Sequence, residues 1–282
     1  MKPAVLLLNL VFAGGLAGAE TVRVQGSGTM AKVFSLAAPV VRAEFGFELK
    51  IRVDGTTTTA IHSAAAGAVD VAMATRPLTA GDRSDFPERA LSEVLIGHQA
   101  LAFVVSRDVW ESGVRSLTKA QALAIYEGGT KNWKALGGAD LAIKFYNPAR
   151  GHGVWEMFAG WLYGEVRKAP LGQKFESVPG GREARDAVAF AAGSFSVAAP
   201  RWADEKTVFA LAIKDEQGAV IEPTPENIQT HHYPLARALY LVAGDRPTGN
   251  VKKLFNFILS PRGQEIVKEA EFTAAKDPKP LE

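Results

Sequence analysis

The sequence contains no cysteine in its 282 residues. This absence excludes disulfide scaffolds, thiolate metal sites, cysteine nucleophiles and a lipid anchor on cysteine. Neither sign of charge dominates, because 32 basic residues are balanced by 30 acidic ones. Nucleic-acid binding, which requires a clustered basic surface, is therefore not expected. Beyond the N-terminal segment no apolar run approaches the roughly 20 residues of a membrane span, so we expect no membrane insertion.

The first nineteen residues have the pattern of a secretory signal peptide. Lys2 precedes an apolar run over 4–16, and Ala-Gly-Ala at 17–19 is an A-x-A-like cleavage site. The run is too short to anchor the chain in a bilayer. We therefore expect residues 1–19 to be removed on export, leaving a protein in the periplasm that is not a lipoprotein.

Strand, loop and helix alternate along the next part of the chain. The segments 21–25 and 49–53 alternate in polarity like strands, whereas 30–44 and 60–66 are typical of helices. A short apolar run over 69–73 predicts a further strand. This order favours an open, mostly parallel α/β sheet, in which ligands bind beyond the carboxyl ends of the strands.

A second lobe is predicted from the middle of the chain. The extended segment 94–106 leads into it, and Thr118 with Gln121 forms a capping box for a helix through Tyr126. The apolar segment 236–243 is expected to return to the first lobe as a strand. The predicted division is 20–103 for the first part of lobe 1, 104–235 for lobe 2, and 236–282 for the second part of lobe 1 with the C-terminal helices.

Four loops after strands are rich in glycine, small hydroxyl residues and arginine. They are 26–29, 55–59, 75–76 and 150–153. A helix N-terminus exposes unpaired N–H groups and a partial positive charge, so it stabilises an anion. Glycine lets the backbone approach a ligand closely, and hydroxyls and guanidinium groups add donors. The pattern therefore indicates an oxyanion site.

Each loop also has a simpler interpretation. Ser27 or Thr29 can cap the helix that follows, and the threonines at 56–59 can cap the next one. Arg76 can form a surface salt bridge, and His152 can be an ordinary loop residue. The recurrence of the same chemistry in four loops favours anion binding over these alternatives.

Motifs of known enzyme classes are missing. The sequence has no complete dinucleotide fingerprint, no G-x-x-x-x-G-K-[ST], no G-x-S-x-G and no H-x-x-x-H pair with a nearby carboxylate. Asp82 and Asp85 are expected in a solvated polar loop, and His231 and His232 on the surface. A phosphatase or esterase using Ser27 as nucleophile would lack a partnered base. We therefore predict no catalytic residue, metal or cofactor.

Several segments have the order and spacing of one known family. They are 26–29, 67–77, 126–138, 233–240 and 255–272. On these segments the chain resembles the periplasmic phosphate-binding proteins of ABC importers, the PstS-like branch of the type II solute-binding proteins. The resemblance implies a two-lobed periplasmic-binding-protein type II fold, with mixed sheets flanked by helices and a ligand cleft between the lobes.

The resemblance also implies a function. A monomeric, non-enzymatic protein would capture phosphate or a related tetrahedral oxyanion and deliver it to an ABC importer permease at the inner membrane. The ligand positions of the family correspond to Thr29 and Met30, to Thr56 or Thr57, to Thr75, and to the loop 150–154. Combined with the loop analysis, the expected ligand-binding residues are Ser27, Gly28, Thr29, Met30, Thr56, Thr57, Thr75, Arg76, Arg150, Gly151, His152 and Gly153.

The chain departs from the family pattern in its fourth loop. Pro148 stands at the usual arginine position, and His152 and Val154 replace a serine and a threonine. Thr75 also replaces an acidic residue that accepts the phosphate proton in some members. We expect Arg76 and Arg150 to restore the charge. The alternative hypothesis is a diverged binding-protein fold that acts as an envelope interaction or signalling module without oxyanion transport.

Overall fold

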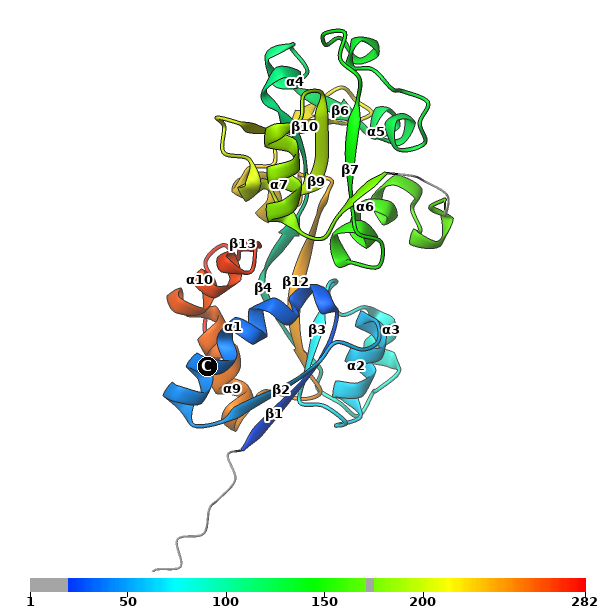
Figure 1. Cartoon of the computed structure of the whole chain (residues 1–282). Helices are drawn as coiled ribbons and strands as arrows, with labels where there is room; N and C mark the ends of the chain where they lie inside the picture. Colours follow the sequence, from blue (N-terminus) through cyan, green and yellow to red (C-terminus); the bar gives the residue numbers. More distant parts are fainter. Residues whose placement is uncertain (1–19, 171–174) are drawn as a thin grey trace, which may run out of the picture.

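A computed structural model describes residues 20–170 and 175–282, so the predicted signal peptide lies outside the described residues. The chain forms two α/β lobes, each built on its own mixed sheet flanked by helices (Figure 1). The predicted fold class is confirmed. Within the described ranges, no helix combines the length and the apolar character needed to cross a bilayer.

Lobe 1 is built on a six-stranded sheet in the order β13-β4-β12-β3-β1-β2. β1 runs parallel to β2 and β3, whereas β12 is antiparallel to β3 and β4. The parallel part ends in the loops that the sequence pointed to. The strands are β1 (Thr21–Gly26), β2 (Glu48–Arg52), β3 (Val71–Ala74), β4 (Ser92–Ala100), β12 (Ala236–Ala243) and β13 (Thr273–Ala274).

Helices cover both faces of this sheet (Figure 1). On one face, buried residues of three helices and the sheet form the main core, which includes Phe34, Met73 and Phe255. A smaller core around Ile61 lies on the other face. The helices are α1 (Gly28–Phe45), α9 (Gly249–Leu259) and α10 (Pro261–Glu269) on the first face, and α2 (Thr57–Ala65) with α3 (Ala80–Ser84) on the second.

Lobe 2 contains the second sheet, in the order β11-β10-β5-β9-β7-β8, with β6 beside β10. β7 is parallel to β8 and β9, and β5 is antiparallel to β9 and β10. The strands are β5 (Ala102–Ser106), β6 (Ser116–Thr118), β7 (Lys144–Pro148), β8 (Glu176–Val178), β9 (Ser194–Ala198), β10 (Val208–Lys214) and β11 (Val220–Ile221).

The core of lobe 2 is aromatic. Phe145 stacks on Phe195 with ring centroids 4.4 Å apart, and Trp133 is fully buried with its indole N–H donating to the carbonyl of Gly193 at 2.8 Å. The α-helices are α4 (Arg107–Glu111), α5 (Lys119–Tyr126), α6 (Gly153–Tyr163), α7 (Gly181–Phe190) and α8 (Pro225–Gln229). The 3-10 helices are η1 (Trp133–Leu136), η2 (Val166–Lys168) and η3 (Pro200–Trp202).

Two adjacent crossovers connect the lobes. β4 passes into β5 with only Leu101 between them, and the Leu101 N–H donates to the carbonyl of Leu235 at 3.0 Å. The returning strand β12 begins at the next residue, Ala236, and pairs with β4 along its length. The chain therefore changes sheets at Leu101 and at Ala236, compared with the predicted boundaries after residues 103 and 235.

Candidate functional site

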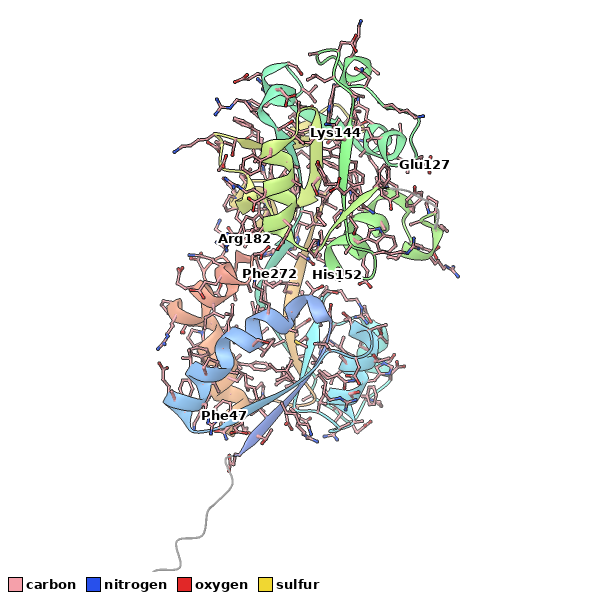
Figure 2. All side chains as sticks on the ribbon, viewed as in Figure 1. Phe47, Glu127, Lys144, His152, Arg182 and Phe272 are labelled. Atoms are coloured by element: carbon pink, nitrogen blue, oxygen red, sulfur yellow. The ribbon has the colours of Figure 1, made fainter. Side chains whose placement is uncertain are left out.

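A cavity of about 520 Å³ lies between the lobes. Lobe 1 supplies the N-terminus of α1 and the segment after α10, lobe 2 supplies the loops before α6 and α7, and the crossover strand β4 closes one side. Figure 2 shows His152, Arg182 and Phe272 at this junction. Polar or flexible lining residues are Ser27, Gly28, Thr29, Lys32, Gln99, Gly151, His152, Gly153, Glu156, Gly180, Gly181 and Glu271.

Three helix N-termini meet at the cavity. Ser27 caps α1 by accepting the Thr29 N–H at 3.3 Å. The N-cap residues of α6 and α7 are His152 and Gly180, and neither provides a side-chain hydrogen bond to its helix. The first N–H groups of a helix have no partner within the helix, and they lie at its partially positive end. In α1 the Thr29 and Met30 N–H groups already donate to Ser27, so the uncapped N-termini of α6 and α7 offer more free donors. The cavity is therefore suited to an anion that accepts these N–H groups.

The two lobes approach each other closely at the rim of this cavity. Gly153 at the start of α6 lies against α1, because a Cβ added there would be only 2.1 Å from Thr29 Oγ1. Gly181 at the start of α7 is equally confined, since its Cβ would be 2.1 Å from the indole nitrogen of Trp202. Only glycine fits at either position without displacing its neighbour.

Half of the sequence-predicted site residues line this cavity. They are Ser27, Gly28, Thr29, Gly151, His152 and Gly153. Met30 does not line it: its side chain is fully buried in the core of lobe 1, and its N–H donates to the carbonyl of Ser27 at 3.0 Å. The structure thus brings the first and fourth loops together from opposite lobes.

The second and third loops meet each other outside the cavity. The hydroxyl groups of Thr57 and Thr75 are 3.1 Å apart, and the Thr75 N–H donates to Thr57 Oγ1 at 3.1 Å. Thr56 caps α2 in a capping box with Thr59. From these two loops only Gly55 lines the cavity, together with Val53 two residues before it. The threonines therefore organise the carboxyl end of the lobe 1 sheet.

Arg76 pairs with an acidic residue, Asp82, and does not line the cavity. Its guanidinium forms a bidentate pair with Asp82 at 2.6 and 3.0 Å and also donates to Thr58 at 3.1 Å. The expectation that Asp82 is solvated is wrong, because it lies in α3 with only 4% of its surface exposed. The Arg76 guanidinium holds the pKa of the Asp82 carboxyl well below its usual range.

Arg150 is also directed away from the cavity. Its guanidinium lies over the Trp155 ring, 4.5 Å from the centroid, and donates to the carbonyl of Pro170 at 3.2 Å. Because of this cation–π contact Arg150 does not line the cavity, whereas Gly151 and Gly153 of the same loop do. Neither arginine identified in the sequence supplies charge to the cavity in this structure.

A different arginine, Arg237, does not itself line the cavity but is hydrogen-bonded to two residues that do, Gln99 and Thr29. It lies in β12, where its Nε donates to Gln99 Oε1 at 2.8 Å and Nη2 donates to Thr29 Oγ1 at 3.3 Å. Burial lowers the pKa of Arg237, and the negative charge of Glu156 acts in the opposite direction. Arg237 is part of the segment 233–240 that carried the family resemblance, but no local motif distinguished it as a site residue.

The N-terminus of α7 was likewise missed as part of the site. Its sequence signal is Gly180-Gly181 after a strand and before an amphipathic helix, the same pattern as the other glycine-rich loops. Two carboxylates of the cavity, Glu156 and Glu271, were also not predicted. Glu271 accepts the Trp202 indole N–H at 2.8 Å and the Lys32 ammonium at 2.7 Å, so it joins lobe 2 to lobe 1.

The histidine and acidic side chains of the described residues do not form a metal-ligating group. In residues 20–170 and 175–282, no three histidine or acidic side chains are grouped so that they could hold a metal ion. His231 and His232 are exposed, and the ring of His231 packs edge-on against that of His98 with centroids 5.0 Å apart. The cavity combines hydrogen-bond donors from three helix N-termini with the carboxylates of Glu156 and Glu271.

Residues 13–262 match a family model described as the PBP superfamily domain. The chain belongs to the PBP superfamily. The two-lobed architecture of this PBP chain is also similar to solved structures. One is a possible phosphate binding protein from Planctomyces limnophilus, with 20% identity, a TM-score of 0.78, and coverage of 92% of this chain and 94% of that one.

Two further proteins are similar to this PBP chain. A putative phosphate ABC transporter substrate-binding protein from Clostridium perfringens, solved with bound phosphate, has 24% identity and a TM-score of 0.63, covering 91% of this chain and 100% of that one. The phosphate-binding protein PstS of Staphylococcus epidermidis is 24% identical over 218 residues, or 75% of this chain. The chain spans 63% of the length of that protein.

Proposed function

We propose that this protein is a non-enzymatic solute-binding protein that captures phosphate, or a related tetrahedral oxyanion, between its lobes. The observation that carries the proposal is the meeting of the α1, α6 and α7 N-termini at one cavity. A tetrahedral anion withdrawn from water needs many donors, and free helix N–H groups supply them without neutralising charge. Its relatives named above include phosphate-binding proteins.

The ligand-binding residues in this proposal come from both lobes. Ser27 and Thr29 offer hydroxyl groups from lobe 1, and the N-terminus of α6 offers N–H groups from lobe 2 beside Gly151 and His152. A neutral His152 ring adds one acceptor and a protonated ring adds charge. Because one anion would contact both lobes, its binding would favour lobe closure.

The wider biological role follows from the same proposal. Delivery to an ABC importer permease at the inner membrane fits one of the similar proteins, a putative phosphate ABC transporter substrate-binding protein. This role requires the protein to act in the periplasm after removal of residues 1–19. A monomer suffices for it, because both lobes of the cavity belong to one chain.

Isothermal titration with phosphate, sulfate, molybdate and tungstate tests the proposal. We expect phosphate to bind at one site per chain and more tightly than the other three. Absence of binding by all four would reject the oxyanion role. That result, together with a stable protein partner on co-purification, would support the interaction or signalling module, an alternative favoured only by the engagement of Arg76 and Arg150 outside the cavity.

A further inference from the structure

Arg237 lies at the junction of the two lobes rather than in a loop of either one. It is the second residue of the crossover strand β12, and it lies opposite Gln99 of the other crossover strand, β4. Its side chain reaches Thr29 at the start of α1. Both of its hydrogen-bond acceptors, Gln99 and Thr29, line the cavity.

The charge of Arg237 has no direct counter-ion in the described part of the chain. No carboxylate oxygen there lies within 4.0 Å of its guanidinium, whereas Arg76 and Arg185 each pair with an aspartate. Glu156 of lobe 2 acts on it only through its charge. Arginine stays protonated in proteins, so burial leaves this cation in place at an energetic cost.

The Arg237 guanidinium has N–H donors beyond the two that it uses in the protein. It carries five N–H groups, and Arg237 uses one on Gln99 and one on Thr29. The two acceptors orient the planar group, and among the described residues no other acceptor takes the remaining N–H groups on Nη1 and Nη2, which leaves them for a ligand. Such a fork matches two oxygens of one tetrahedral anion.

We infer that Arg237 is the cationic ligand-binding residue of this site, and that it donates to the same oxyanion as Thr29 and the helix N-termini. The inference rests on the proposed function and adds the charge that Arg76 and Arg150 do not supply. Because Arg237 is on the crossover, the anion would be bound at the hinge as well as by both lobes. Lobe closure would then bring the α6 N-terminus onto an anion already held by the crossover.

The test compares Arg237→Met with a matched control, Arg115→Met, in the full chain. Arg115 is an exposed arginine whose guanidinium lies over Trp110 in lobe 2, and it does not line the cavity. Inorganic phosphate is titrated by calorimetry, and the thermal midpoint is measured with and without phosphate. We expect Arg237→Met to weaken phosphate binding roughly 10- to 100-fold, as loss of one or two charge-assisted bonds implies. Arg115→Met should leave it unchanged.

The stability measurement separates a binding role from a structural one. Removal of a partly buried charge without a counter-ion should leave the phosphate-free midpoint of Arg237→Met unchanged or raised, while its shift with phosphate is lost. A lowered midpoint with wild-type affinity would overturn the inference. If the methionine variant does not fold, Arg237→Lys is used instead, because lysine keeps the positive charge but lacks the planar guanidinium. We expect Arg237→Lys to bind phosphate more weakly than the wild type. Equal binding would contradict the inference.

The outcomes also separate this inference from the proposed function. If the wild-type protein binds no phosphate, both fail together. If the wild type binds phosphate and Arg237→Met binds it equally well, only the assignment of Arg237 fails, and the helix N-termini remain as the site.

Discussion

His98 shows how a single buried residue links stability to pH. It lies in the crossover strand β4, is 1% exposed, and has no hydrogen-bond partner for either ring nitrogen among the described residues. Burial, with a smaller effect of the His231 charge, lowers its pKa to about 4. The folded protein therefore keeps His98 neutral at pH values where an unfolded chain protonates it.

Between the ordinary histidine pKa near 6.5 and the lowered value, the unfolded chain binds a proton that the folded chain does not. The free energy of unfolding should therefore fall as the pH decreases from about 6.5 to about 4, by up to about 1.4 kcal/mol per pH unit. Urea unfolding across this range measures the slope. His98→Phe should reduce it, whereas the control His232→Gln, at an exposed histidine, should not. An unchanged slope in His98→Phe would contradict this account.

Glu156 is a carboxylate in a cavity otherwise suited to anions, so it should affect which anion binds. Its charge repels every anion, but it can accept the proton of hydrogen phosphate, which sulfate lacks. We expect Glu156→Gln to raise sulfate affinity several-fold more than phosphate affinity. The matched control is Glu183→Gln, an acidic residue in the first turn of α7 that does not line the cavity. Parallel changes for both anions in Glu156→Gln would contradict a selective role.

At the scale of elements, local signals predict structure well. The capping box of Thr118 and Gln121 starts α5 at Lys119 as expected, and the apolar segment 236–243 is β12 with the same bounds. These features depend on neighbours in sequence. The Ser27 cap and the glycine-rich loop before α6 were predictable for the same reason, since a helix start is encoded within a few residues.

Side-chain pairings that depend on the tertiary structure were not predictable in this way. Arg237 and Gln99 are 138 residues apart and meet only through the register of β4 with β12. The pairing of Arg76 with Asp82 depends on α3, a short helix in a segment expected to be a polar loop. A single sequence shows which residues carry chemistry, but tertiary register decides which partner each one meets.

The start of α6 offers a direct test of the interlobe contact. A methyl group at position 153 would collide with Thr29 Oγ1, so Gly153→Ala should keep α6 from reaching α1. We expect phosphate affinity to fall about 10-fold, equivalent to about 1.4 kcal/mol. Gly160→Ala on the same helix is the control, because its Cβ would meet only Val166 at an ordinary 3.7 Å. Wild-type affinity in Gly153→Ala would show that this approach is unnecessary.

At the scale of the whole molecule, several contacts beside the crossovers hold the lobes together. Thr29 meets Gly153, Glu271 accepts the Trp202 indole N–H, and Gln229 of α8 donates to the carbonyl of Ala274 at 2.9 Å. Glu271 has a left-handed backbone, with φ of 75°, and directs its carboxylate to the indole N–H of η3 while Lys32 neutralises it. Phosphate release from a closed protein would require this hydrogen bond to break.

Trp202→Phe removes the indole N–H and retains an aromatic ring against Glu271. We expect phosphate dissociation, followed by stopped flow, to become several-fold faster, because one charge-assisted bond of the closed state is lost. Trp161→Phe in the same lobe is the control, since its indole makes no hydrogen bond in the part of the chain that the structure describes. Equal dissociation rates in both variants would exclude Glu271 and Trp202 from lobe closure.

The central claim is that one oxyanion is bound where the α1, α6 and α7 N-termini and the crossover meet. A crystal structure of the full folded chain grown with phosphate, with a second crystal soaked in tungstate for its anomalous signal, tests it most directly. We expect one tetrahedral anion, within hydrogen-bond distance of Thr29, the first N–H groups of α6 and Arg237. A cavity that stays without the anion in crystals containing phosphate, or an anion bound elsewhere on the surface, would contradict the account.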